Sequence, residues 1–240
     1  KVVELLKELK YVGRLFTEHG GVGELDLEKT WVENGVLEDS EIVFLRTDRI
    51  IKLKSTFSNN TVKKIKDIIQ KVEPGIVYDI CIRSSHIDDV SPFGRENVKA
   101  LRLYDCHRVK DVSSLENMET VVLNLTSVRN VSSLGNVKAL HLSTSGPNEI
   151  TDVSSLGNVK KLGLAKLQGV WDVSSLGDVE TLYIYDCPVV DVSSLGTVKT
   201  LILIKLPVVD VSSLGTVKTL ILDRCPNIVD VSSLGNVPNL

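Results

Sequence analysis

Short runs in which aliphatic residues alternate with other residues recur from about residue 76 to the end of the chain. Leu101-Arg102-Leu103, Leu140-His141-Leu142 and Leu220-Ile221-Leu222 are examples. Such alternation predicts β-strands whose two aliphatic side chains face a core while the middle side chain faces outward. The runs recur about every twenty residues, a period typical of proteins that stack copies of one supersecondary unit.

A second pattern lies between the predicted strands, where the phrase Asp-Val-Ser-Ser-Leu-Gly or a variant recurs. One copy contains Ser91-Pro92, and proline favours the first position of a helix. We therefore predict that Ser91 and its equivalents cap short 3₁₀ turns whose leucine enters the core. The aspartate is expected to accept backbone amide hydrogens in an Asx turn. The phrase begins at Asp89, Asp111, Asn130, Asp152, Asp172, Asp191, Asp210 and Asp230.

These aspartates would form a row with neighbours about 5 Å apart, the spacing of stacked coils. Hydrogen bonds from amides can offset the repulsion between the carboxylates. A row of carboxylates could also bind Ca²⁺. Because each coil supplies only one carboxylate, we favour a structural role and expect no metal site.

The chain divides into two predicted parts. Residues 1–75 carry no copy of the repeat, and their apolar spacing predicts two helices, several short strands and a hairpin. We predict an N-terminal α+β cap domain over residues 1–75 and a solenoid over residues 76–240. The fold class is an α/β solenoid of about eight short coils, with parallel strands on one side and 3₁₀ turns opposite. An independent binding domain is the alternative for residues 1–75.

Composition narrows the class of partner. The chain has 240 residues, a net charge of −3 and 5% aromatic residues. Without an excess of basic residues to neutralise phosphates, we expect no nucleic-acid partner. No apolar run reaches the roughly 18 residues of a membrane span, and the amphipathic start of the chain is unlike a signal peptide.

The four cysteines, Cys81, Cys106, Cys187 and Cys225, are predicted to be free thiols. The last three take equivalent places in coils that do not adjoin, and coils two apart are separated by about 9–10 Å. That separation exceeds the reach of a disulfide. We therefore expect a reducing, intracellular compartment, or a virus particle.

No set of residues predicts catalysis. The four histidines have no metal-like spacing to one another or to a cysteine pair. The segment Gly20-Gly21-Val22-Gly23 is too short for a phosphate-binding loop. We expect no enzyme activity, no cofactor and no metal.

The repeat resembles a known family. Leu-x-Leu-x-x followed by Val/Ile-x-Asp-Val-Ser-Ser-Leu resembles leucine-rich repeats, and the turn from Asp89 to Pro92 resembles their short internalin-like and phosphatase-regulator-like class. The phrase Asp-Val-Ser-Ser-Leu-Gly-Asn-Val-Lys-x-Leu is similar to repeat proteins of giant nucleocytoplasmic DNA viruses such as marseilleviruses, and of some marine protists. The resemblance covers residues 76–240 and implies a scaffold rather than a particular ligand. The family's usual buried asparagine is replaced by Cys106, Cys187, Cys225, Ser85, Ser145, Thr126, Leu167 and Leu206.

The outward-facing residues change character along the predicted stack. Early coils present polar residues such as Arg102 and His141, whereas the last three present tyrosine and isoleucine. The residue just before each aspartate changes from charged to apolar in the same direction. Contiguous exposed apolar residues mark interaction sites, and Tyr and Trp are typical anchors. The predicted partner-binding residues are Tyr183, Tyr185, Ile202, Ile204, Ile221, Trp171, Val190 and Val209. The alternative is that strand-forming residues were copied with the repeat and bind nothing.

These observations predict a non-catalytic protein–protein interaction module that uses its outward strand face, in the host cell of a large DNA virus. One alternative is a structural component of the virus particle. Another is a substrate receptor of a ubiquitin ligase, although strands are predicted in residues 1–75 where an F-box would be helical. Residues 236–240 begin a further coil, and an open strand edge there would invite association with another chain.

Overall fold

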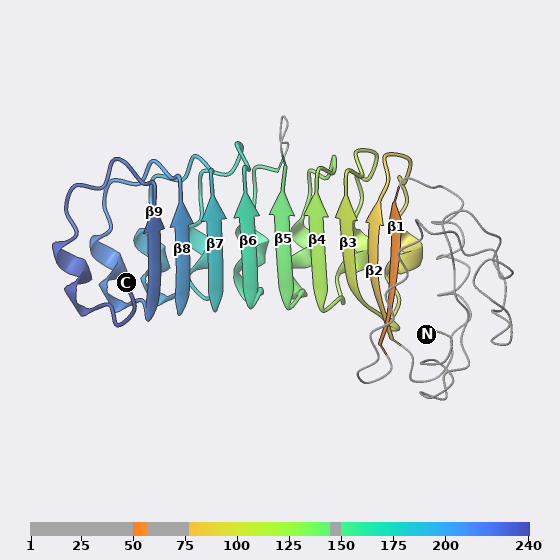
Figure 1. Cartoon of the computed structure of the whole chain (residues 1–240), viewed down its shortest axis with the longest axis horizontal. Coiled ribbons are helices and arrows are strands. Elements are labelled where there is room, and N and C mark those ends of the chain that lie inside the picture. The colour runs from red at the N-terminus through yellow and green to blue at the C-terminus, as the bar shows by residue number, and fades with distance from the viewer. Residues whose placement is uncertain (1–49, 57–76, 145–149) are drawn as a thin grey trace, which may run out of the picture.

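A single parallel sheet of nine strands, in chain order, forms one side of the molecule (Figure 1). A computed structural model describes the protein at residues 50–56, 77–144 and 150–240. Each strand pairs with the next one along the chain, so the sheet is an open stack without crossovers. The strands are β1 (Ile50–Thr56), β2 (Val77–Arg83), β3 (Val98–Tyr104), β4 (Thr120–Asn124), β5 (Ala139–Ser143), β6 (Lys161–Ala165), β7 (Thr181–Tyr185), β8 (Thr200–Ile204) and β9 (Thr219–Asp223).

Short 3₁₀ turns line the opposite side of the stack, behind the strands in Figure 1. This arrangement confirms the predicted leucine-rich-repeat solenoid, with one strand and one turn in each coil. The turns are η1 (Ser91–Phe93), η2 (Ser113–Leu115), η3 (Ser132–Asn136), η4 (Ser154–Asn158), η5 (Ser174–Leu176), η6 (Ser193–Thr197), η7 (Ser212–Thr216) and η8 (Ser232–Asn236).

The core is a column of aliphatic side chains between the strands and the turns. In the coil that leads to β8, the buried residues are Val192 and Leu195 of the repeated phrase, Val198 after the turn, and Leu201 and Leu203 of the strand. Each is at most 1% exposed, and the pattern recurs along the stack up to the last coil, where Val231 is 55% exposed. Burial of such side chains from water is the main favourable contribution to folding.

The aspartate of each repeated phrase forms the predicted Asx turn. The amide of Ser193 donates to Asp191 Oδ1 at 2.8 Å, and the amide of Ser132 donates to Asn130 Oδ1 at 2.9 Å. The amide and hydroxyl of Ser193 hold the pKa of Asp191 below its usual value. For Asp172, repulsion from neighbouring aspartates raises the pKa less than the Ser174 hydrogen bonds lower it.

The predicted serine cap was wrong by one position. The residue before each turn is a valine, for example Val90 before η1, and it makes no side-chain capping bond. Ser91 is the first residue of the turn, and Pro92 follows it. Asp89, two residues before Ser91, supplies the capping oxygen instead. Its Oδ1 accepts a hydrogen bond from the Ser91 amide in the Asx turn.

Adjacent coils approach closely on the turn side, where most coils have glycine. A Cβ added to Gly196 would lie 2.4 Å from the Ser213 carbonyl oxygen of the next coil. The same contact recurs from coil to coil, with Gly135 facing Ser155, for example. Hydroxyl groups also link the coils here, since Thr216 Oγ1 donates to the Gly196 carbonyl at 2.7 Å.

The residue after most strands adopts a left-handed backbone conformation, which the sequence analysis did not predict. None of these residues is glycine, and their φ angles lie between 51° and 57°. The conformation lets the chain leave the strand while its amide still bonds the next coil; the Lys205 amide, for example, donates to the Asp223 carbonyl at 2.9 Å. The residues are Asp105, Leu125, Lys166, Asp186, Lys205 and Arg224.

The position directly after the left-handed residue was predicted to be buried. It is buried at Cys106, Cys187, Leu167 and Leu206. The first coil differs, because Ser84 is buried and Ser85 is exposed. The prediction for Ser85 was therefore wrong. Ser84 is not among the residues of positive φ, so the chain leaves β2 by a different path. Ser145 lies outside the described residues.

The sheet extends into the segment predicted as a cap domain. β1 runs parallel to β2 and pairs with it from Ile50 opposite Val77 to Thr56 opposite Arg83. A strand was predicted near this place, and it covers the edge of the first coil. The remaining predicted elements of residues 1–75 lie outside the described residues, so the cap domain and its boundary stay a prediction.

We expect Gly196→Ala to lower the free energy of unfolding by about 1–3 kcal/mol, the usual cost of overpacking. The new methyl group would press against the Ser213 carbonyl, which is backbone and cannot turn aside. Gly235→Ala is the matched control, because no atom lies within 4 Å of a Cβ there. Urea unfolding measures both variants. Equal destabilisation would contradict the proposed contact.

The aspartate row should make the solenoid sensitive to acid. The pKa values of these aspartates are lowered in the folded state. Their contribution to the free energy of unfolding is therefore complete above about pH 4, the pKa in the unfolded chain, and is lost as the pH falls further. Replacing Asp172, Asp191 and Asp210 with Asn should keep the turn, as Asn130 does. The urea midpoint of the variant should fall less than that of the wild type between pH 5 and 2. Parallel curves would exclude this role.

Candidate functional site

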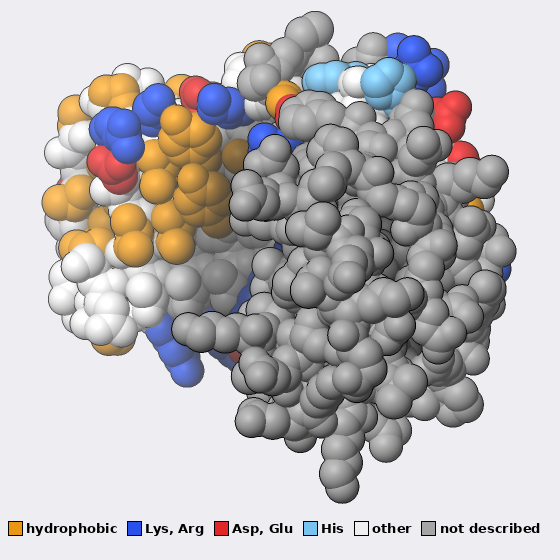
Figure 2. Space-filling view, turned by 45° about the vertical axis from the view of Figure 1, so that its right-hand side comes forward, with side chains coloured by type: hydrophobic (Ala, Val, Ile, Leu, Met, Phe, Trp, Pro, Cys, Tyr) orange, Lys and Arg blue, Asp and Glu red, His pale blue; other side chains and the backbone are white. Residues whose placement is uncertain are grey.

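The register of the sheet gathers five apolar side chains on its outer face. Tyr183, Ile202 and Ile221 occupy one row across β7, β8 and β9, and Tyr185 and Ile204 occupy the next row. We call these five residues the strand-face patch. All are at least partly exposed, and Ile221 is 46% exposed. In Figure 2, hydrophobic side chains gather at this end of the molecule, beside basic and acidic ones.

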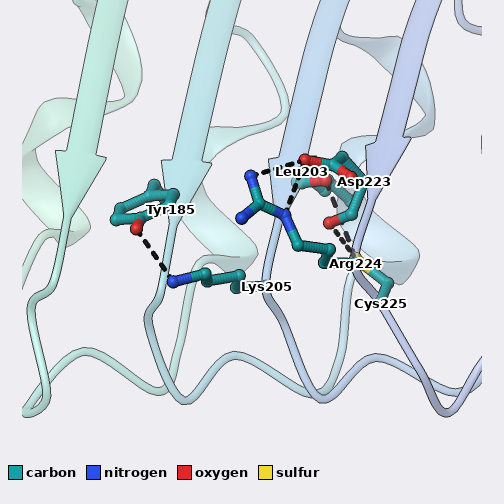
Figure 3. A network of polar contacts seen from close by, with 6 residues as sticks. All are labelled: Tyr185, Leu203, Lys205, Asp223, Arg224 and Cys225. Atoms are coloured by element: carbon teal, nitrogen blue, oxygen red, sulfur yellow. Dashed lines mark hydrogen bonds and ion pairs between the residues drawn. The ribbon is translucent and has the colours of Figure 1, made fainter.

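The two tyrosines of the strand-face patch are held rigidly. Their rings are parallel within 4° and their centroids are 6.4 Å apart. Lys205 Nζ lies 5.2 Å from the centroid of the Tyr185 ring and donates to its hydroxyl at 3.1 Å (Figure 3). Burial raises the pKa of Tyr183, so the phenol stays neutral at physiological pH.

Charged side chains border the patch where the strands end. Arg224 Nη2 lies 2.9 Å from Asp223 Oδ2 (Figure 3). Lys205 and Arg224 both directly follow a strand, and both have the left-handed conformation. This backbone directs a row of polar side chains along the edge of the apolar surface. The sequence analysis missed this border because it did not predict the left-handed positions.

Trp171, Val190 and Val209 form a separate surface. They are 65%, 51% and 51% exposed, and they lie in the segments that lead from a strand to the following turn. Val229 continues the column and is 90% exposed. These residues are exposed as expected, but they do not belong to the strand face. A binding role for them, as for the strand-face patch, stays a prediction.

A depression beside the strand-face patch was not predicted. Gly163 and Ala165 of β6 face outward, yet both are buried, unlike the outward residues of the neighbouring strands. They are small, and larger side chains of β5 and β7 rise on both sides of them. The depression has a volume of about 320 Å³, and its lining includes His141, Lys161, Gly163, Thr181 and Tyr183. The signal in the sequence was a Gly-x-Ala strand between strands with larger outward residues.

The chemistry available for catalysis is limited in the part of the chain that the structure describes. No group of three or more His, Cys, Asp or Glu residues there could hold a metal ion. Burial raises the pKa values of Cys106 and Cys187 to about 11, so both remain protonated thiols at neutral pH. Burial lowers the pKa of His141, which is therefore neutral. The Sγ–H groups of Cys106 and Cys187 point toward carbonyls of the preceding coil. Cys106 Sγ lies 3.8 Å from the Ile82 carbonyl oxygen.

The outer edge of β9 is largely open within the described residues. One edge of β9 pairs with β8. On the other edge, the amide of Leu220 donates to the Asn239 carbonyl at 2.9 Å. Thr219 and Asn239 form an isolated parallel bridge. Association of another chain with this edge stays a prediction. None of the described helices is both long and apolar enough to cross a membrane.

Comparisons with known proteins return only distant structural likenesses. No protein-family model matches the sequence, and no curated protein matches it. Internalin C2 of Listeria monocytogenes is 20% identical over 68% of this chain and 70% of its own, with a TM-score of 0.44. The internalin inlF of the same species is 17% identical over 78% of this chain and 57% of its own, with a TM-score of 0.48.

A third similar structure is the functional domain of InlJ from Listeria monocytogenes, which includes a cysteine ladder. It is 15% identical over 68% of this chain and 43% of its own, with a TM-score of 0.49. The matches to inlF and InlJ thus span less than two thirds of those chains. Likenesses this distant carry no information about the partner of this protein. None of the three proteins is viral, so a viral origin stays a prediction.

The buried thiols should be chemically inert. In native protein at pH 8, we expect iodoacetamide to label Cys225, which is partly exposed, at least tenfold faster than Cys106 and Cys187. Peptide mass spectrometry over time measures each rate. In urea, all three cysteines should react alike, which provides the control. Equal rates in the native protein would mean that the two cysteines are accessible thiolates.

Proposed function

We propose that this protein is a non-catalytic protein-binding module, and that the strand-face patch is its binding surface. The observation that supports the proposal most directly is the register of β7, β8 and β9, which places Tyr183, Ile202 and Ile221 side by side. Soluble proteins rarely expose contiguous apolar surface without a binding role.

The composition of the patch favours a protein partner. Tyrosine is enriched among residues that contribute most to binding, because it buries a large area and also offers a hydroxyl group. The charged border formed by Lys205, Asp223 and Arg224 resembles the polar rim that surrounds the apolar centre of many interfaces. Such charges set orientation and association rate more than affinity.

The patch is also preorganised. The stacked tyrosines and the Lys205 contact restrict rotamers before any partner arrives. Binding therefore costs less side-chain entropy than it would on a surface of mobile side chains. Beneath the patch, β7 and β8 pair with a strand on each side, while β9 pairs with β8 and bonds Asn239 on its other side.

The proposed cellular setting rests on the sequence alone, through the resemblance of the repeat and the predicted free cysteines. We propose an adaptor in a reducing compartment of a cell infected by a large DNA virus, with a component of the virus particle as the second candidate. An adaptor would hold one partner in infected cells, whereas a particle component would co-purify with particles in fixed stoichiometry. A ligase receptor would additionally hold a ligase subunit through residues 1–75.

Replacing Tyr183, Tyr185, Ile202 and Ile204 with Ser should abolish retention of the partner. The four side chains are at least partly exposed, so the strands beneath them should persist. Quantitative mass spectrometry of proteins that co-purify with each form from the native source measures retention, and we expect a loss of at least tenfold for one protein.

The matched control is Tyr104→Ser with Asn124→Ser, which lie in one row of β3 and β4 on the same face and outside the lining of the depression. Circular dichroism and a urea midpoint would verify the fold of both variants. The proposal fails if the patch variant retains every protein that the wild type retains, or if the control loses the same protein.

A further inference from the structure

We propose that the depression over β6 receives one large apolar side chain from an acidic segment of the protein partner. The inference rests on the proposed function and adds the chemistry of the partner. The depression shares Tyr183 with the strand-face patch, so a partner seated on the patch would extend into it.

The size of the depression suits a single side chain. The lining runs over four neighbouring strands, from Thr120 and Val122 of β4 to Tyr183 of β7, around a volume of about 320 Å³. His141, Gly163 and Tyr183 occupy one row across β5, β6 and β7. An aromatic or long aliphatic side chain fills such a space, while a whole peptide backbone would lie across the rim.

The lining is predominantly apolar at neutral pH. Val122 and the methyl-bearing Thr120 and Thr181 contribute to the walls, and His141 is neutral because burial lowers its pKa. The imidazole of His141 lies over Gly163, since a Cβ at position 163 would lie 2.4 Å from His141 Nδ1, so this ring position depends on glycine there. A buried apolar side chain is thus the group that this surface can stabilise.

The charge beside the depression is positive. Lys160, Lys161 and Lys199 all lower the pKa of Glu180, which directly precedes β7. Three lysines beside the carboxylates of Glu180 and Asp178 leave one positive charge in excess, although the whole chain has a net charge of −3. Lys161 also lines the depression, and Lys166 is exposed at the opposite end of β6.

An apolar space between cations is complementary to a segment that has one large apolar residue flanked by Asp or Glu. The negative charge of the whole chain would repel such a segment from most other surfaces, which concentrates the attraction here. A nucleic acid would need a broader basic surface than these few lysines provide.

The test selects from a phage-displayed library of random peptides on the full wild-type chain. We expect the enriched peptides to combine an aromatic or long aliphatic residue with Asp or Glu. The best peptide should bind at least tenfold more weakly to Gly163→Val, in which the added side chain collides with the His141 ring in the lining of the depression. It should also bind at least tenfold more weakly to Lys160→Glu with Lys161→Glu.

The matched control is Lys110→Glu with Lys218→Glu, which makes the same change in net charge at exposed positions outside the lining. Its affinity should stay within twofold of the wild type. The lysine variants keep the test valid if Gly163→Val does not fold. Absence of enrichment, enrichment of basic peptides, or unchanged affinity for the Lys160/Lys161 variant would overturn the inference.

Failure of this inference is distinguishable from failure of the proposed function. If the native partner is lost by the four-serine patch variant but retained by both depression variants, protein binding at the patch stands and the acidic anchor does not. If the patch variant also retains the partner, both fail.

Discussion

Successive coils must keep the same close spacing on both sides of the molecule. On one side the strands are joined by backbone hydrogen bonds, which fix their separation at about 4.8 Å. On the other side, Gly196 and its equivalents lie against a carbonyl oxygen of the next coil, with no room for a side chain. The hydroxyl bonds and the buried aliphatic column depend on this spacing, because each links a coil to its neighbours, whereas each Asx turn lies within one coil.

The same spacing determines the surface. Since strands pair one to one from β3 to β9, every outward position of one coil lies beside the equivalent position of the next. A few substitutions in adjacent coils therefore create a continuous feature. Tyrosine and isoleucine in β7 to β9 make the strand-face patch, while Gly163 of β6 lies in the lining of the depression beside it.

Much of this fold could be predicted because the determining patterns are local and repeated. Alternating aliphatics located the strands, and the Asp-Val-Ser phrase located the turns and the Asx bonds. The register row of Tyr183, Ile202 and Ile221 followed from equal coil lengths. Features that depend on contacts between coils were missed, namely the left-handed residues, the burial of Ser84 instead of Ser85, and the depression over Gly163. Trp171 was correctly expected to be exposed, but its separation from the strand face depends on the path between strand and turn.

Residues 191–203 and 210–222 are identical, and both begin a coil that meets its neighbours through the same glycine and strand contacts. A whole coil could therefore be duplicated or deleted here without creating a new kind of contact. Each such event would lengthen or shorten the stack by about 4.8 Å. Recombination between the two identical segments would thus change the number of coils in the stack. It would also change the number of isoleucines on the strand face, while the contacts between neighbouring coils stay the same.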